Sequence, residues 1–235
     1  DALAHTQSFA DLSGRDRAFA RAMAAAALRR LGGLDAVIAQ FLQKPLPETA
    51  AHGRAMLRIG AAQLLLMDTP AHAAVGETVE AANSMSKSRG FAKLINAVLR
   101  KIAAEGAALL RAQPPGTDLP AGLFTRWRAT YGGETAAAIA LALRNEPPLD
   151  VSAKADARDW AKALGAQLTA TGSLRLREAA PVDMLPGFDE GAWWVQDAAA
   201  ALPARLLGDV RGKTILDLCA APGGKTLQLA AAGAT

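Results

Sequence analysis

The hydrophobic pattern of the first hundred residues has the period of a helix. Apolar positions recur three and four residues apart, and prolines, glycines or polar turns interrupt the repeat at intervals. This spacing predicts an all-helical bundle. The expected helices cover about residues 13–31, 34–43, 48–67, 70–85 and 91–104.

Local residues indicate where these helices start and stop. The Ser13 hydroxyl is expected to accept a hydrogen bond from the Asp16 N–H and so cap the first helix. The pair Gly32-Gly33 is expected to end it. Thr69 and Pro70 predict a cap and first helical residue for the fourth.

The pattern changes after residues 113–120, which hold three prolines and lack periodicity. Such a segment is typical of a domain boundary. Two helices are expected beyond it, over about 122–131 and 134–143, and then short strands over 149–153, 167–170 and 174–177 with a helix over 155–164. Asp197 is expected to cap a helix over 198–207. The predicted domains are therefore 1–113, 114–190 and 191–235.

The last stretch combines a predicted strand, a small-residue turn and a helix. Residues 214–218 are aliphatic and β-branched, residues 219–226 are rich in small residues, and residues 227–232 are apolar. A strand that leads through glycines into a helix collects unbonded backbone N–H groups and the positive end of the helix dipole at one point. The sequence therefore predicts a site for an anionic or strongly polar ligand.

Two readings of this turn compete. Gly224, Lys225 and Thr226 fit the end of a phosphate-binding loop, Gly-x-x-x-x-Gly-Lys-Ser/Thr, but this spacing requires glycine where Cys219 stands. A Cβ at that sharp turn argues against a phosphate loop. The first strand-to-helix turn of a Rossmann-like sheet fits better, since Gly223 and Gly224 allow close approach to an adenosyl ligand and Asp217 lies near the strand end.

Composition and charge narrow the class of protein. The chain has 235 residues, 51% of them hydrophobic, with a net charge of +4 and one cysteine. We expect a globular chain without disulfides in a reducing compartment, the cytoplasm. No apolar run reaches the ~20 residues of a membrane span. Residues 1–113 hold 14 Lys/Arg against 9 Asp/Glu, so either a solvated surface or a nucleic-acid partner explains the basic surplus.

Several segments together carry a family resemblance. Asp217-Leu-Cys-Ala-Ala-Pro-Gly-Gly-Lys-Thr226 resembles the first S-adenosylmethionine motif of the Sun/Fmu (RsmB) family of ribosomal RNA cytosine-5 methyltransferases. Residues 13–17, 72–80 and 95–100 are similar to that family's N-terminal domain, which resembles the NusB antitermination factor. Residues 185–188 and 195–197 resemble the approach to its catalytic domain.

The resemblance implies a fold and an activity. The fold class is an all-helical NusB-like bundle, a small α/β linker subdomain, and the first strand, turn and helix of a Rossmann-like methyltransferase sheet. The cofactor is S-adenosylmethionine, and the implied partner is ribosomal RNA of the small subunit. In the family, one cysteine attacks C6 of cytosine and a second assists release, both from later motifs. We therefore expect this chain to be an inactive N-terminal portion without a catalytic residue or metal site. We also expect it to be a monomer.

The resemblance assigns cofactor contacts to the turn and suggests RNA contacts in the helical domain. The cofactor-binding set is Asp217, Cys219, Ala220, Ala221, Pro222, Gly223, Gly224 and Lys225. The basic residues expected to contact RNA are Arg15, Arg17, Arg29, Arg30, Lys87, Arg89, Lys93, Arg100 and Lys101. Periodicity does not establish that they share a face.

Alternatives remain open at this stage. A P-loop nucleotide hydrolase and a non-enzymatic NusB-like RNA-binding protein are the two other functions considered. Trp193 and Trp194 either stack on RNA bases or pack against the predicted sheet. Gln196 and Asp197 either frame the cofactor pocket or, for Asp197, serve only as a helix cap.

Overall fold

The computed structural model describes residues 3, 5–176 and 181–235. The chain forms two compact units, Asp1–Asn145 and Glu146–Thr235. The division falls after Asn145, beyond the boundary predicted at the proline-rich residues 113–120. The reason is that the two helices following that segment pack on the 3-10 helix η2 (Pro115–Asp118), which itself packs on helix α3 (Leu31–Phe41).

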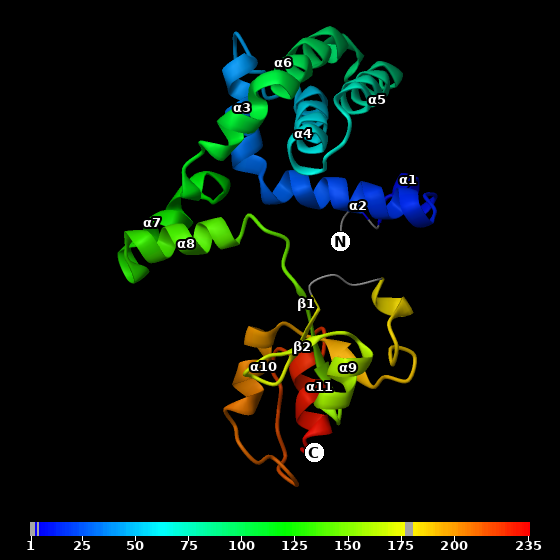
Figure 1. Cartoon of the computed structure of the whole chain (residues 1–235), viewed down its shortest axis with the longest axis vertical. Helices are drawn as coiled ribbons and strands as arrows, with labels where there is room; N and C mark the ends of the chain where they lie inside the picture. Colours follow the sequence, from blue (N-terminus) through cyan, green and yellow to red (C-terminus); the bar gives the residue numbers. More distant parts are fainter. Residues whose placement is uncertain (1–2, 4, 177–180) are drawn as a thin grey trace. The chain divides into compact units, whose positions relative to one another are not determined.

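The first unit is helical throughout its regular structure (Figure 1). Its elements are α1 (Gln7–Ala10), α2 (Gly14–Arg29), α3 (Leu31–Phe41), α4 (Ala51–Leu66), α5 (Ala71–Ser84), η1 (Arg89–Phe91), α6 (Ala92–Arg111), η2 (Pro115–Asp118), α7 (Ala121–Tyr131) and α8 (Gly133–Ala142). The predicted bundle is confirmed.

Helix α6 is the centre of this bundle. It packs against α3, α4 and α5, and its residues Ile95, Leu99 and Ile102 are fully buried with Leu34 and Leu57 from its neighbours. The apolar repeat continues past the predicted end at residue 104, because Leu110 is buried as well. The helix therefore runs to Arg111 and passes through Gly106 without ending.

Gly32 and Gly33 lie inside a helix, and the prediction that they end one is wrong. The break falls at Arg30, and both glycines belong to the first turn of α3. A Cβ on Gly32 would lie 1.9 Å from the Thr117 carbonyl oxygen, and the Gly33 N–H donates to Asp118 Oδ1 at 2.7 Å. The glycines are thus required by the close approach of η2 and not by a helix end.

Two predicted caps also differ. The Ser13 hydroxyl makes no capping bond, and the Asp16 N–H donates to the Ser13 carbonyl oxygen at 3.0 Å. Pro70 is the cap of α5, one residue before the helix, and not its first residue. Ser13 and Pro70 thus each occupy the residue just before a helix. The backbone is not yet helical there, and the first N–H groups of the helix that follows have no partner within it.

The second unit is built on a four-stranded antiparallel sheet in the order β2-β3-β1-β4. Its elements are β1 (Leu149–Ala153), α9 (Ala157–Ala163), β2 (Gln167–Leu168), β3 (Leu174–Leu176), η3 (Val182–Met184), β4 (Trp193–Val195), α10 (Ala198–Arg205) and α11 (Gly224–Ala231). The predicted strand at 149–153 is confirmed. The last residue of the predicted strand 174–177, Arg177, lies outside the described residues.

Strand β4 was not expected from the sequence, because three residues are too few for a period to be visible. In the sheet, Val151 of β1 pairs with Val195 on one side and with Leu174 on the other. Val151, Leu174 and Trp193 are buried, and the Trp193 indole N–H donates to the Pro186 carbonyl oxygen at 2.8 Å. Trp193 is therefore a core residue, as the packing alternative required.

Residues 214–218 do not form a strand, which corrects the prediction. They have no strand assignment, and the backbone hydrogen bonds of this region run to the end of the chain: the Ile215 N–H donates to the Thr235 carbonyl oxygen at 2.9 Å, and the Thr235 N–H donates to the Lys213 carbonyl oxygen at 2.9 Å. A strand requires a ladder, and Leu216 and Leu218 are 81% and 85% exposed. Two of the aliphatic side chains that predicted a buried strand, Leu216 and Leu218, are therefore exposed.

Candidate functional site

The predicted cofactor turn connects the extended segment to α11. Asp217 holds it closed, since its carboxylate accepts hydrogen bonds from the Thr226 hydroxyl at 2.8 Å and from the Cys219 N–H at 3.2 Å. The Gly223 N–H donates to the Ala220 carbonyl oxygen at 2.6 Å. Gly223 has φ +109°, a left-handed conformation that favours glycine. The turn thus folds back on Asp217 at both of its ends.

The helix that follows presents its N-terminus without a side-chain cap. Its first N–H groups have no helical acceptor, and they carry the positive end of the dipole. A cavity of about 260 Å³ lies beside this end and is lined by Lys225 and Asp217 with apolar residues that include Leu207 and Leu218. Such a cavity offers an apolar wall, a cation and an anion to one ligand.

A buried glutamine connects the turn helix to the sheet. Gln196, 5% exposed, accepts hydrogen bonds on Oε1 from the Ser152 hydroxyl at 2.8 Å and the Trp194 indole at 3.0 Å. Its Nε2 donates to Gln228 Oε1 of α11 at 3.0 Å, and Gln228 Nε2 donates to the Ala201 carbonyl oxygen at 3.0 Å. The two amides therefore hold α11 against β1, β4 and α10.

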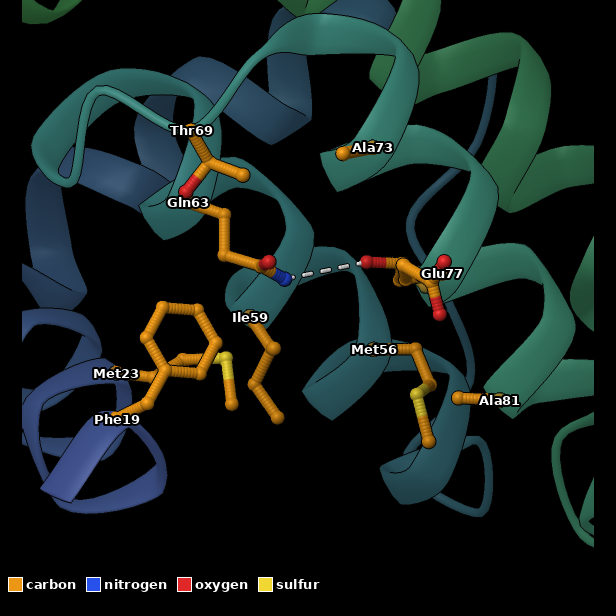
Figure 2. A pocket seen from close by; sticks show the side chains of 10 residues that line it. Phe19, Met23, Met56, Ile59, Gln63, Thr69, Ala73, Glu77 and Ala81 are labelled. Carbon is orange, nitrogen blue, oxygen red and sulfur yellow. Dashed lines mark hydrogen bonds between the residues drawn. The ribbon is translucent and has the colours of Figure 1, made fainter. Parts of the chain in front are cut away.

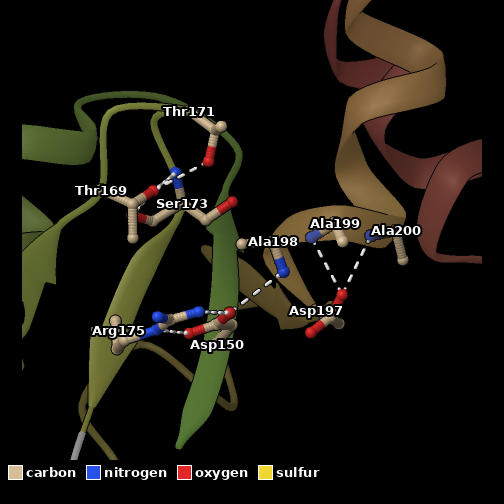
Figure 3. A network of polar contacts seen from close by, with 9 residues as sticks. All are labelled: Asp150, Thr169, Thr171, Ser173, Arg175, Asp197, Ala198, Ala199 and Ala200. Atoms are coloured by element: carbon tan, nitrogen blue, oxygen red, sulfur yellow. Dashed lines mark hydrogen bonds and ion pairs between the residues drawn. The ribbon is translucent and has the colours of Figure 1, made fainter. Parts of the chain in front are cut away.

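The start of α10 is fixed by two carboxylates (Figure 3). Asp197 accepts from the N–H groups of Ala199 and Ala200 at 2.9 and 3.0 Å, which confirms it as the cap. Asp150 of β1 accepts from the Ala198 N–H at 3.0 Å. It also pairs with Arg175 of β3, whose Nε and Nη2 lie 2.7 and 2.8 Å from its two oxygens.

The pairing changes the acidity of Asp150. The hydrogen bonds from the Arg175 guanidinium hold the pKa of Asp150 below its usual value, and the Ala198 N–H acts in the same direction against the effect of burial. Asp150 is therefore a carboxylate at neutral pH, and the pKa of Arg175 is raised in turn. No local pattern in the sequence predicts this pair, because Asp150 and Arg175 meet only through the register of β1 and β3.

The expected cofactor residues come together on this one turn. Cys219 is a free and exposed thiol. Ala220, Ala221 and Pro222 are exposed, and Gly224 is partly covered, because its Cα faces the Gln196 side chain. Sequence reasoning missed Gln228, a polar residue on an apolar helix whose partner lies 32 residues away.

The expected RNA-contact residues lie in several places on the helical unit. Arg15 and Arg17 are on α2, Lys87 and Arg89 are at the junction of α5 and η1, and Lys93, Arg100 and Lys101 are on α6. All seven are exposed, whereas Arg29 is half-buried. Lys93 and Arg100, seven residues apart, lie on the side of α6 opposite to buried Ile95 and Ile102, and Lys101 lies about a quarter-turn away from them.

Arg30 has a different environment from the rest of that set. Its Nε lies 2.9 Å from Asp118 Oδ2, its side chain is only 13% exposed, and Arg144 Nε lies 3.0 Å from the same oxygen. Together with the Gly33 N–H, these contacts hold η2 and Arg144, two residues after α8, to the start of α3. Arg30 therefore stabilises the fold. Its guanidinium is already paired with Asp118 and largely buried, so it is poorly placed to bind an RNA phosphate.

An apolar cavity of about 550 Å³ lies between α2, α4 and α5 (Figure 2). Phe19, Met23 and Ile59 line it together with buried Gln63 and Thr78. The Gln63 amide donates to the Thr78 hydroxyl at 3.4 Å, and Thr78 donates to the Ala74 carbonyl oxygen at 2.7 Å. The polar pair is thus satisfied mainly within the bundle.

Metal and membrane sites are not found in the described chain. Over residues 3, 5–176 and 181–235, no group of three or more His, Cys, Asp or Glu side chains is placed to hold a metal ion. Among the helices built from those residues, none is both long and apolar enough to cross a membrane.

The sequence of the chain is similar to a known family and to named proteins. Residues 1–104 match the NusB family. A protein of Pseudomonas putida (strain KT2440) named ribosomal RNA small subunit methyltransferase B is 40% identical over 230 residues, which is 92% of this chain and 52% of the relative. A protein of the same name from Xanthomonas campestris pv. campestris is 37% identical over 226 residues, 92% of this chain and 50% of the relative.

A solved structure extends this agreement to both units. The crystal structure of PH0851 matches with a TM-score of 0.66 and 18% identity, over 94% of this chain and 54% of that chain. The chain spans about half the length of the curated relatives that it matches. The family resemblance carried by the sequence motifs is thereby confirmed: the chain has a NusB-family region at residues 1–104 and is similar over most of its length to ribosomal RNA small subunit methyltransferases B.

Proposed function

We propose that this chain provides the RNA-binding unit and the first part of the cofactor site for S-adenosylmethionine-dependent methylation of small-subunit ribosomal RNA at C5 of cytosine. The observation that carries the proposal is the turn from Asp217 to Thr226, which leads into an uncapped helix N-terminus in a chain similar to ribosomal RNA methyltransferases. The relatives' shared name suggests small-subunit ribosomal RNA as the substrate and methyl transfer as the reaction, and the resemblance of the turn motif suggests the cofactor and C5 of cytosine.

The residues of the turn suit an adenosyl ligand. The left-handed Gly223 has no heavy atom within 4 Å of where a Cβ would be, so a ligand can approach the backbone there. The uncapped N–H groups of α11 and the Lys225 side chain would face its polar groups. The cofactor, when bound, supplies a methyl group on a sulfonium centre. The protein's part is to hold that ligand and keep the turn in place through Asp217.

The P-loop alternative has no comparable support. In a phosphate loop the Thr226 hydroxyl would bind Mg²⁺, whereas here it donates to the Asp217 carboxylate at 2.8 Å. Cys219 also stands where that loop needs glycine. A solely RNA-binding protein would need neither the turn nor the bonds from Gln196 that hold its helix.

Cys219 belongs to the cofactor turn in this proposal and is not the nucleophile. Its backbone N–H helps to close the turn by donating to Asp217. The sequence has one cysteine, whereas the proposed chemistry uses two. We expect the 235-residue chain alone to bind the cofactor weakly and to transfer no methyl group. Tritiated methyl transfer to small-subunit ribosomal RNA by this chain alone would contradict the assignment.

Calorimetric titration tests the cofactor site directly. We expect S-adenosylmethionine and S-adenosylhomocysteine to bind, and ATP with Mg²⁺ to give no heat. Gly223→Ala should abolish binding because φ +109° is strained for any side chain. Gly191→Ala is the matched control, since Gly191 also has positive φ and open space around it. Equal losses in both variants, or binding of ATP in place of the adenosyl ligand, would refute the proposal.

A further inference from the structure

A second groove on the helical unit lies between the end of α3 and the middle of α6. Its volume is about 410 Å³, within the range of roughly 300–1,000 Å³ that small-ligand sites occupy. It is lined by Phe41, Leu42, Gln43, Lys44, Leu94, Ala97, Val98 and Lys101. The basic residues predicted to contact RNA do not include any in α3, because the only charged residue of that helix is Asp35.

The groove has an apolar floor and a basic rim. Phe41 and Leu42 are half-buried and pack on the bundle core. Lys44 and Lys101 are exposed, and within the described part of the chain neither forms an ion pair. No lining residue is acidic. The site therefore offers an aromatic ring, two free ammonium groups and the Gln43 amide.

The positive charge continues along α6 beyond the groove. Lys93 and Arg100 are exposed on the same helix, and the Arg100 Nε donates to Asn96 Oδ1 at 3.2 Å, which leaves its terminal nitrogens available. Glu105, one turn past Lys101, marks the end of this basic stretch. Lys93 and Arg100 lie about a quarter-turn around α6 from Lys101, so a partner bound at the groove meets Lys101 first and these two cations on the neighbouring side of the helix.

We propose that this groove binds one unpaired nucleotide of RNA, with its base against Phe41 and its flanking phosphates on Lys44 and Lys101. The inference rests on the proposed function, which supplies RNA as the ligand. A stacking ring beside lysines is the combination that single-stranded nucleic acid requires. A paired base cannot leave its stack to reach the ring without a cost, so the groove should distinguish loops from duplex.

An acidic protein segment is the competing occupant, and the contacts favour RNA over it. Carboxylates would satisfy the lysines but leave the aromatic floor without a specific partner. A nucleotide satisfies both, because the phosphate and the base are adjacent parts of one ligand. Competition with poly-glutamate therefore belongs in the test.

The test measures binding of the whole chain to two fluorescent RNAs, a hairpin with an unpaired loop and a duplex of the same length. Phe41→Leu keeps an apolar side chain on the core and removes the ring. Because stacking on an aromatic side chain contributes about 1–3 kcal/mol per base, we expect at least about 5-fold weaker binding of the hairpin. Duplex binding should not change. Phe19→Leu, an exposed aromatic on α2, is the matched control.

The lysines are tested by salt dependence. Lys44→Ala and Lys101→Ala should each lower the slope of log Kd against log salt by about 0.7, the value for one single-strand phosphate. Lys162→Ala, a charge-matched exposed lysine of the second unit, should not change the slope. Circular dichroism and melting confirm that every variant is folded.

The outcomes separate the groove from the broader proposal. Cross-linking of a 4-thiouridine in the hairpin loop to the peptide that contains Phe41 supports the groove. If the hairpin binds with salt-sensitive affinity and neither the affinity nor its salt dependence changes in the three groove variants, the groove is not the binding site. The proposed function is then unaffected. Displacement of the hairpin by poly-glutamate at equal charge, or equal loss of duplex binding, also overturns it. Absence of RNA binding by the unsubstituted chain refutes both proposals.

Discussion

Replacement of Asp150 by alanine should destabilise the second unit strongly. The Asp150 side chain is 3% exposed and accepts two hydrogen bonds from Arg175 and one from the Ala198 N–H. Removing one member of a fully buried pair costs about 3–5 kcal/mol. Arg175 is 38% exposed and can turn to water, so we lower the expected loss to about 2–3 kcal/mol.

The measurement follows unfolding of the second unit within the whole chain. A loss of this size should lower its melting temperature by about 8–24 °C, since 1 kcal/mol corresponds to roughly 4–8 °C in a unit of this size. Tryptophan fluorescence is a suitable signal, because Trp160, Trp193 and Trp194 lie in this unit and only Trp127 in the other. Hydrogen exchange at the start of α10 should rise in parallel.

Asp209→Ala is the matched control. Asp209 also pairs with an arginine, Arg211, at 2.7 Å, but both side chains are more than half exposed. We expect no measurable change, because an exposed pair is already solvated and screened. Equal destabilisation by the two substitutions would refute the argument that burial and the bond to Ala198 make Asp150 important.

The pH dependence provides a second check on Asp150. Its pKa is lowered in the folded protein, chiefly by the hydrogen bonds from Arg175, so its stabilisation is fully present above the unfolded value of about 3.9. It is lost as the pH falls through the folded pKa. Asp150→Asn should therefore be less stable than the unsubstituted chain at pH 7, and the difference should shrink below about pH 4. A difference that stays constant down to pH 3 would show that the charge is not responsible.

Three further substitutions test the packing. Gly32→Ala should destabilise the helical unit by about 3 kcal/mol or more in urea unfolding, since its Cβ would lie 1.9 Å from the Thr117 carbonyl oxygen; an unchanged midpoint would contradict this. Gly76→Ala, in an exposed part of α5 with open space, should stabilise the same unit by about 0.5–1 kcal/mol. Gln196→Met keeps the length but removes the amide, so it should cost about 1–3 kcal/mol and speed hydrogen exchange in the first turn of α11; exchange equal to that of the unsubstituted chain would show that Gln228 does not depend on it.

The sequence predicted helices well where the apolar repeat was long. Five or more turns of α6 carry the pattern without ambiguity, and buried Ile95, Leu99 and Ile102 follow from it. Glycine was misleading at Gly32, because a glycine that permits close packing looks like one that ends a helix. The distinction depends on η2, some 85 residues later, and no local rule contains it.

For the candidate site, the sequence predicted the turn but not the environment of the segment before it. The turn is a local motif, because Asp217 bonds to residues only two and nine positions later, Cys219 and Thr226. A spacing this short can be recognised in the sequence. The aliphatic run before it predicted a buried strand, yet burial depends on partners that composition does not name, and Leu216 and Leu218 are exposed. The groove on α3 and α6 was missed for the same reason.

A polar network behind the proposed cofactor turn connects α11 to the small antiparallel sheet and to α10. Ser152 on β1 and Trp194 on β4 both donate to Gln196 Oε1, which fixes the direction of its amide. Only one orientation then lets Nε2 donate to Gln228 on α11. Because buried amides are costly when unpaired, rotation of α11 would break several bonds at once. The sheet therefore determines the direction in which the N-terminus of α11 presents its N–H groups.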